Sequence, residues 1–582
     1  MKPSMRLGLV ALLTLSAACG GGGDGREPGN PAGPLPVGGN GNTGAVPGAS
    51  GTGNAPSNGG APNGGAPAGQ GGTPTTPDER PDFTADCAAP KAGSPVLRLL
   101  TRNELELTLA DVFPEVKGKW TNSLPAPMVT KATGFDNESS AQVGGQLASA
   151  MLETALSVAT AVTGDQLASV LPCASSAGDR ACATDFLTRY GRRLFRRALT
   201  PAESTRYLTY FDAALAKSDF KTALKWMTVG LIQSPNAVYR HEIGTVQADG
   251  TRALTPTEIA TELAYTYTGS TPTETLLAQA ESGALTDPAA LAKTLLATEA
   301  GKQAFQRFFE TYVGYPRAVS IQKTKVQDYA MVSGDMLQET RRFIDDVLLQ
   351  KGGGVKELLT APSTNPSLRL AQYYGLSAPS SDYASVTRPS GRGIGLLAQG
   401  SFLSTRSSSD ASSPTQRGIF VLTRLLCRHV PDPPQAVPPL ATGPTGPITT
   451  RQRYEEAHAQ GACTGCHRLF DPVGFGFEHF DEAGRYRDAE GTLPVDSASH
   501  ILAEDGSTLF EFANQEELMT KLAAQPEVYQ CFAGFLSTYA FGTAEACLGA
   551  GQVANLQQGT VGIAEAFANL AAEPHFTRRS AN

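Results

Sequence analysis

Recurrent signals for helix starts constrain the fold of this chain more than any other feature. In each signal a threonine is followed three residues later by a glutamate, so that the two side chains can cap each other's backbone amides. The signals begin at Thr101, Thr200, Thr255 and Thr271, and proline occupies the first helical position in the last three. Strand signals are few by comparison. We therefore predict a mostly α-helical protein with helices that start at these four places.

The first 19 residues predict export and a lipid anchor. Basic residues precede a nine-residue, largely apolar run at Leu7–Leu15, which is too short for a bilayer that needs about 20 residues and is typical of a secretory signal peptide. Small residues before Cys19 resemble the lipobox of bacterial lipoproteins, in which the cysteine is acylated. The alternative is an ordinary cleaved signal peptide. Because Gly20 follows, and not the Asp that retains lipoproteins at the inner membrane, we expect an outer-membrane protein that is periplasmic or surface-facing.

A long polar segment follows the predicted anchor. Residues 20–85 consist mainly of Gly, Pro, Ala, Asn, Thr and Ser, which offer too little apolar surface to offset the entropy of folding. We predict a disordered tether with a root-mean-square reach of roughly 40 to 45 Å. The net charge of -8 gives no basic field, so composition offers no support for nucleic-acid binding.

The nine cysteines divide into three groups. Cys19 is assigned to lipid, and Cys463 and Cys466 belong to a motif described below. The remaining six are Cys87, Cys173, Cys182, Cys427, Cys531 and Cys547. An even number in an exported chain predicts disulfides. Short separations favour the pairs Cys173–Cys182 and Cys531–Cys547, and elimination then leaves Cys87–Cys427.

The motif Cys463-Thr464-Gly465-Cys466-His467 carries the clearest chemistry. In this spacing two thiols one helical turn apart can add to the vinyl groups of a haem, and the following imidazole can bind its iron. A zinc site and a redox dithiol are the alternatives. Zinc usually requires a second pair of ligands, and a redox dithiol usually follows a strand in a βαβ unit, and neither context is present. We predict one covalent haem c, with His467 as the proximal ligand.

The ligand on the opposite face of the iron decides between electron transfer and catalysis. Met519 is the only methionine after the motif and is the distal candidate that we favour. It also falls in an amphipathic stretch, where a core position is an equal alternative. The other candidates are His429, His458, His479 and His500.

Two arginine patterns are also visible. A basic stripe on one helix is expected from the arginines at 189, 192, 193, 196 and 197. It could be a docking face for an acidic partner or for haem propionates. The commoner alternative is that these arginines pair with neighbouring carboxylates. In addition, Ser234-Pro235-Asn236 with Tyr239-Arg240 resembles Glu573-Pro574-His575 with Arg578-Arg579.

Several stretches together resemble the planctomycete-type cytochrome family, a group of large exported proteins of unknown function. The stretches are 99–104, 134–137, 192–200, 396–403, 413–418, 468–478, 480–481 and 484–487. The resemblance covers nearly all of the chain from residue 95. It implies a mostly helical body and a c-type haem at Cys463, Cys466 and His467, and it fits Cys531 and Cys547 as a recurring pair.

We therefore expect a multi-domain helical body with a cytochrome c-like haem segment after the tether. The expected boundaries are 1–19 (signal peptide and lipobox), 20–85 (linker), 86–170, 171–250 and 251–387 (helical domains), 388–495 (cytochrome c-like domain) and 496–582 (helical domain). A proline-rich stretch at 431–447 separates the helical body from the motif. The leading function is electron transfer to a redox partner protein. The alternatives are a haem peroxidase or oxygenase, and a surface binding or scaffold protein with a structural haem.

Overall fold

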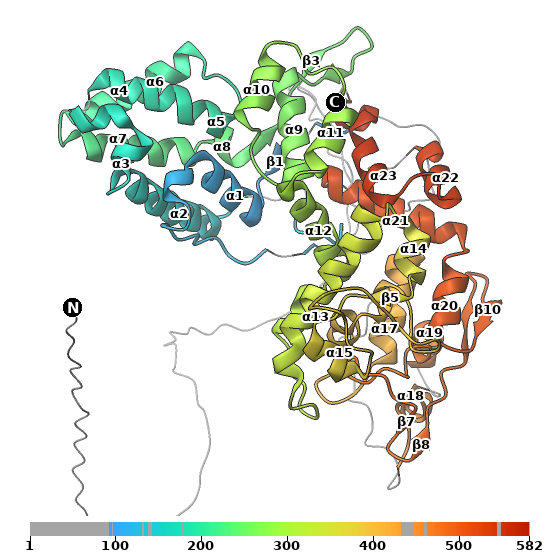
Figure 1. Cartoon of the computed structure of the whole chain (residues 1–582). Coiled ribbons are helices and arrows are strands. Elements are labelled where there is room, and N and C mark those ends of the chain that lie inside the picture. Colours follow the sequence, from blue (N-terminus) through green and yellow to red (C-terminus); the bar gives the residue numbers. More distant parts are fainter. Residues whose placement is uncertain are drawn as a thin grey trace, which may run out of the picture. The chain divides into compact units, whose positions relative to one another are not determined.

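The computed structural model describes residues 92–580 except 96, 128, 131–132, 138–142, 177–178, 432–446, 459–462 and 544–548. The signal peptide with Cys19, the tether, Cys87, Cys547 and most of the proline-rich stretch lie outside the described residues. Within them the protein is mostly helical, as predicted. The strands are short and form small sheets of two or three (Figure 1). Among the described helices, none is long and apolar enough to cross a lipid bilayer.

Three of the four predicted helix starts are confirmed. Helices α1 (Arg102–Val112), α6 (Pro201–Leu215) and α9 (Pro256–Thr268) each begin with a complete capping box. At α1 the Glu104 amide donates to the Thr101 hydroxyl at 3.1 Å, and the Thr101 amide donates back to the Glu104 carboxylate at 2.8 Å. Local side-chain chemistry is therefore sufficient to set these starts.

The fourth predicted start is wrong by two residues. Helix α10 (Glu274–Glu281) begins after Thr273, whose hydroxyl accepts from the Leu276 amide. The Thr271 hydroxyl instead donates to the Arg193 carbonyl at 2.9 Å, and the Glu274 carboxylate pairs with Arg192. The two side chains of the expected capping box are thus held by another segment of the chain.

A first core joins the amino-terminal helices. Helix α2 (Gly145–Thr163) packs against α7 (Phe220–Ile232), and α6 packs against α7. The other elements here are α3 (Leu167–Val170), α4 (Arg180–Phe186), α5 (Arg192–Phe195) and α8 (Pro235–Val238), with β1 (Leu97–Leu99) antiparallel to β2 (Tyr239–His241). In this core the Phe113 ring stacks on the rings of Phe186 and Tyr190, which are tilted against each other.

A second, larger core extends from Phe135 to Phe576 and includes Phe470 and Val473, which follow the Cys463–His467 motif. Its helices include α11 (Pro288–Leu296), α12 (Glu299–Val313), α13 (Tyr329–Ile344), α14 (Val355–Thr360), α16 (Gly400–Thr405), α17 (Pro414–Phe420), α20 (Gln515–Leu522), α21 (Pro526–Phe541), α22 (Ala550–Gln558) and α23 (Ile563–Asn569), together with α9. Phe308 lies near its centre, with its ring against Phe135, Phe532 and Tyr539. Helices that are distant in sequence therefore share one apolar interior.

Of the three predicted disulfides, one is right and two are wrong. Cys173–Cys182 is present, as predicted. Cys427, however, bonds to Cys531 across 104 residues, so the predicted pairs Cys531–Cys547 and Cys87–Cys427 are both wrong. Helix α21 packs along the π-helical turn Val421–Leu425 that precedes Cys427, and this packing brings the two sulfur atoms together. Helix packing, and not separation along the chain, decides this pair.

The five arginines do not form a basic stripe, because the helix ends at Phe195. Arg196 adopts a left-handed backbone conformation (φ 59°), is 2% exposed and donates to the Ala237 and Asn236 carbonyls. The other four face carboxylates: Arg189 with Asp185, Arg192 with Glu274 and Glu281, Arg193 with Glu274, and Arg197 with Glu203. The alternative of pairing with neighbouring carboxylates is the correct one.

The sequence echo corresponds to two similar turns. Helix α8 leads into β2, and the four-residue helix α24 (Pro574–Thr577) leads into β11 (Arg578–Arg579), which pairs with β4 (Arg252–Ala253) and through it with β3 (Thr245–Val246). Each strand carries a buried arginine that meets a buried carboxylate. Arg240 lies 3.5 Å from Glu262, and Arg579 donates to Glu242 at 2.5 Å.

Candidate functional site

The Cys-X-X-Cys-His motif forms the first turns of helix α19 (Cys463–Phe475). Cys463 and Cys466 are thiols that are not joined in a disulfide, and both are partly buried. Cys466 packs against the edge of the larger core. His467, one turn after Cys463, is also partly buried. The helix therefore presents two thiols and one imidazole within its first two turns.

His467 is held by an aspartate from the next turn of the same helix. Its Nδ1 donates to Oδ2 of Asp471 at 2.9 Å, because an ionised carboxylate can only accept. The Phe470 ring packs edge-on against the imidazole, with 4.8 Å between ring centroids. With Nδ1 engaged, Nε2 is the nitrogen that can bind a metal.

A second histidine reaches the same carboxylate oxygen from helix α18 (Thr450–His458). His458 Nδ1 donates to Asp471 Oδ2 at 2.6 Å, and its ring centroid lies 3.5 Å from that of His467. The other oxygen, Oδ1, accepts from the Thr415 hydroxyl of α17 at 2.5 Å. Asp471 is only 4% exposed. Three helices thus converge on one buried carboxylate.

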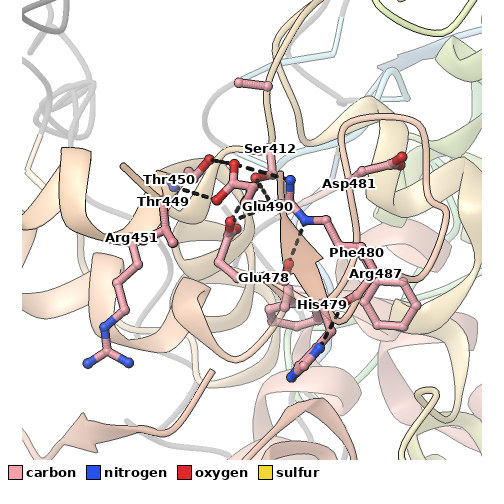
Figure 2. Close-up of polar contacts among 12 residues, drawn as sticks. Ser412, Thr449, Thr450, Arg451, Glu478, His479, Phe480, Asp481, Arg487 and Glu490 are labelled. Carbon is pink, nitrogen blue, oxygen red and sulfur yellow. Dashed lines mark hydrogen bonds and ion pairs between the residues drawn. The ribbon is translucent and has the colours of Figure 1, made fainter. Parts of the chain in front are cut away.

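The segment after α19 fixes the start of α18, as Figure 2 shows. Thr450 is the first residue of α18, and its amide donates to the Glu490 carboxylate at 2.5 Å. Arg487 lies 3.1 Å from Glu490 and donates to Glu478 at 3.0 Å. Glu478 also accepts from the Ser412 hydroxyl at 2.8 Å. These contacts anchor α18, and therefore His458, against the body of the domain.

A buried arginine shapes the turn that carries Glu478. Arg417 of α17 is completely buried and donates to the carbonyls of Phe477, Phe480 and Asp481, each at 2.9 Å. Burial lowers the pKa of Arg417 to about 10 and raises the pKa of Glu478. Glu478, Arg487 and Glu490, which follow α19, thus form a clamp that links α17, α18 and α19.

The structure places the distal candidates in different surroundings. Met519 is completely buried in α20, in the larger core with Leu518 and Leu522. His479 interacts with the Arg487 carbonyl at 2.9 Å and stacks on Tyr486, and His429 is exposed. His458 binds Asp471 beside His467. The described contacts of His467 are with His458, Phe470 and Asp471, and Met519 as an iron ligand stays a prediction.

A polar pocket of about 610 Å³ lies beside α19, and His500 is among its lining residues. It is bounded by α18, α19, α20 and the hairpin β9 (Ser499–Leu502) and β10 (Thr508–Phe512). Arg451 extends over the Phe475 ring at 5.0 Å from its centroid and also contacts Asp496. Acidic and basic side chains both line the pocket, and its charge does not select a class of ligand.

Sequence reasoning missed Asp471 and Thr415 as parts of the site. A signal for Asp471 was available, because residues four apart lie on the same helix face and a carboxylate often supports a metal-binding histidine. No comparable signal exists for Thr415 or for the position of His458, which depend on how α17 and α18 pack on α19. His458, His467 and Asp471 also form a set that could hold a divalent metal ion, with ligand atoms within 4.8 Å of one another.

The chain matches three models of protein families. Residues 182–242 match PSD5, "Protein of unknown function (DUF1595)", residues 254–376 match PSD4, "Protein of unknown function (DUF1592)", and residues 392–490 match PSCyt3, "Protein of unknown function (DUF1588)". No curated protein and no solved structure matches the chain. The PSCyt3 segment contains α17, α18, α19 and the clamp around them. These matches support the resemblance seen in the motifs.

Proposed function

We propose that this protein is a cell-envelope lipoprotein that carries one covalent haem c and transfers electrons. Cys463 and Cys466 would hold the porphyrin through thioether bonds, and His467 Nε2 would bind the iron. The haem would supply an iron that cycles between the ferric and ferrous states. Cys19 would carry the lipid, and residues 20–85 would tether the folded body to the outer membrane.

The observation that carries the proposal is the donor set at the start of α19. The two motif cysteines are not joined in a disulfide, whereas four other cysteines of the described chain are. The imidazole that follows them is held through Nδ1, which is how proteins fix the tautomer of a metal-binding histidine. The free thiols and the oriented imidazole support attachment of haem c at this helix start.

The residues around the motif have separate tasks in this proposal. Asp471 fixes the orientation of His467, and the clamp of Glu478, Arg487 and Glu490 keeps α18 against α19. The larger core supports one side of the motif helix through Phe470 and Val473. A rigid support of this kind keeps reorganisation small when the charge on a bound metal changes.

A haem peroxidase is the second candidate, because of one observation. A carboxylate that accepts from His467 Nδ1 makes the imidazole a stronger electron donor, and strong proximal donation stabilises the higher oxidation states of iron. A peroxidase also needs an open face on the iron, whereas an electron-transfer protein usually closes it with a second protein ligand.

The first test is haem staining on denaturing gels after expression with the machinery for c-type haem maturation. The wild type should stain, and a variant with both Cys463→Ala and Cys466→Ala should not. Gly465→Ala is the matched control inside the motif, because a Cβ atom at Gly465 meets nothing within 4 Å. A wild type that carries stoichiometric zinc and no haem would overturn the proposal and assign the site to the ion of His458, His467 and Asp471.

Absorption spectra separate the two haem functions. A low-spin spectrum that carbon monoxide and peroxide leave unchanged supports electron transfer, and Met519→Leu should then convert it to high spin if Met519 is the sixth ligand. A high-spin ferric spectrum with binding of carbon monoxide after reduction, together with peroxide turnover, supports the peroxidase and overturns the electron-transfer function.

A further inference from the structure

We propose that Asp471 and His458 together set the redox potential of the haem, acting in opposite directions through His467. This inference rests on the proposed haem at Cys463, Cys466 and His467 and concerns two residues that contact His467. Asp471 and His458 are positioning residues, because each would act on the iron only through the His467 imidazole.

The first step of the argument is the charge on Asp471. Its Oδ2 atom lies 2.9 Å from His467 Nδ1, and its side chain is almost completely buried. A buried anion that accepts from the imidazole increases the basicity of the ring and its donation to a metal at Nε2. Stronger donation favours the ferric over the ferrous state and therefore lowers the potential.

The second step is that Oδ2 is shared. His458 Nδ1 donates to the same oxygen at 2.6 Å, the shorter of the two contacts. Each donor withdraws part of the negative charge that the carboxylate could otherwise offer to the other. His458 therefore weakens the effect of Asp471 on His467. The Thr415 hydroxyl does the same in a smaller way, because it donates to the other oxygen, Oδ1.

The third step concerns what keeps His458 in place. Its ring lies edge-on to Tyr454, with 5.4 Å between centroids, and its backbone carbonyl accepts from the Thr464 hydroxyl of α19 at 2.9 Å. Glu490 holds the other end of α18 through Thr450. The distance from His458 to Asp471 is thus fixed from both ends of α18.

The test is a redox titration of the purified, haem-loaded protein and two variants. Asp471→Asn should raise the midpoint potential, because the amide is neutral and cannot strengthen the imidazole. His458→Phe should lower it, because the ring remains and the competing donor is lost. We expect each change to alter the ratio of ferric to ferrous stability by about tenfold, the lower end of the usual effect of such partners on a metal site, which is ~59 mV for one electron.

The matched control is Glu456→Gln, which removes the same charge from an exposed position on α18. Its potential should stay close to that of the wild type. Resonance Raman spectroscopy of the ferrous protein gives a second readout if the iron is five-coordinate, because the iron–histidine stretch should fall in Asp471→Asn and rise in His458→Phe. A purely structural role would move both variants in one direction, as general loosening of the site would.

The outcomes separate this inference from the function on which it rests. If the wild type shows no covalent haem, the proposed function fails. If all proteins carry haem and the two variants have the potential of the wild type, or shift it in the same direction, the function stands and this inference is wrong. Should Asp471→Asn fail to fold, His458→Phe still tests it, since it should lower the potential while Glu456→Gln leaves it unchanged, and a rise or no change in His458→Phe would overturn the inference.

Discussion

Gly418 in α17 lies directly against the backbone of Phe470 in α19, so close that a Cβ atom built on Gly418 would stand 1.9 Å from the Phe470 carbonyl oxygen. Gly474 makes the reciprocal approach, since its Cβ atom would stand 1.9 Å from the Pro414 carbonyl oxygen. The two helices therefore touch through their backbones. This close crossing brings the Thr415 hydroxyl to Asp471.

Because α17 and α19 cross so closely, we expect Gly418→Ala to disrupt the site around Asp471 and His467. The methyl group must push α17 away from α19, and such overpacking usually lowers the free energy of unfolding by about 1 to 3 kcal/mol. We expect a lower thermal midpoint and less haem per chain in a pyridine haemochrome assay. Gly465→Ala, which places a methyl group in open space, should match the wild type in both measurements. Equal behaviour of the two variants would contradict the role of the crossing.

The disulfide Cys427–Cys531 should contribute more stability than Cys173–Cys182. In the chain-entropy model a closed loop of about 100 residues is worth ~4.7 kcal/mol and a loop of about 10 residues ~2.6 kcal/mol. The two loops here have separations of 104 and 9 residues. Both cysteines of one pair are replaced by serine, one pair at a time, and unfolding in urea is measured. The two losses of stability then show which disulfide contributes more. A larger loss from the short loop would contradict the prediction.

His575 should make the protein sensitive to acid. The ring lies 4.3 Å from the Phe541 ring, and burial lowers the pKa of His575 from 6.5 to about 3. Between these values the unfolded chain binds a proton that the folded chain excludes, so stability is lost as the pH falls from 6.5 towards 3. The contribution is about 1.4 kcal/mol per pH unit.

His575→Phe should therefore flatten the dependence of urea midpoints on pH below 6.5. Burial raises the pKa of Glu242 to about 8, so Glu242 makes the stability change with pH in the opposite direction at higher pH. Each variant must therefore be compared with the wild type at the same pH. His429→Phe, at an exposed position, is the control and should keep the slope of the wild type. An unchanged slope in His575→Phe would mean that another group causes the acid sensitivity.

The predicted lipid anchor is tested at Cys19. Cys19→Ser should abolish incorporation of labelled palmitate and move the protein from the membrane fraction to the soluble fraction. The variant with Cys463→Ala and Cys466→Ala keeps Cys19 and should remain in the membrane fraction. Palmitate incorporation that persists in Cys19→Ser would overturn the anchor.

Local patterns in the sequence predicted local structure well. The capping boxes at Thr101, Thr200 and Thr255 need only four consecutive residues, and all three mark helix starts. Thr271 has the same pattern and is not a cap. Its hydroxyl binds the Arg193 carbonyl, and the Glu274 carboxylate of the pattern pairs with Arg192. A local signal fails where a distant segment offers the same side chains better partners.

Non-local contacts were the part that could not be predicted. The bond from Cys427 to Cys531 depends on the packing of α21, and the shortest separation was a poor guide. At the candidate site the spacing of Cys463, Cys466 and His467 was visible in the sequence, and Asp471 could have been found from its position on the helix. The contact of His458 depends on two helices meeting, for which one sequence contains no signal.

The two buried arginines, Arg240 and Arg579, link segments of the chain that are distant in sequence. Arg240 contacts Glu104 and Glu262, and Arg579 contacts Glu242, which follows β2 by one residue. Two turns of similar sequence, at residues 234–240 and 573–579, thus place arginines beside neighbouring buried carboxylates. Residues of the segments 254–376 and 392–490 lie in the larger core, and the segments 182–242 and 254–376 meet where Arg240 contacts Glu262, so contacts join each matched segment to another. A fragment limited to residues 392–490 would expose apolar surface now covered by α12 and α21.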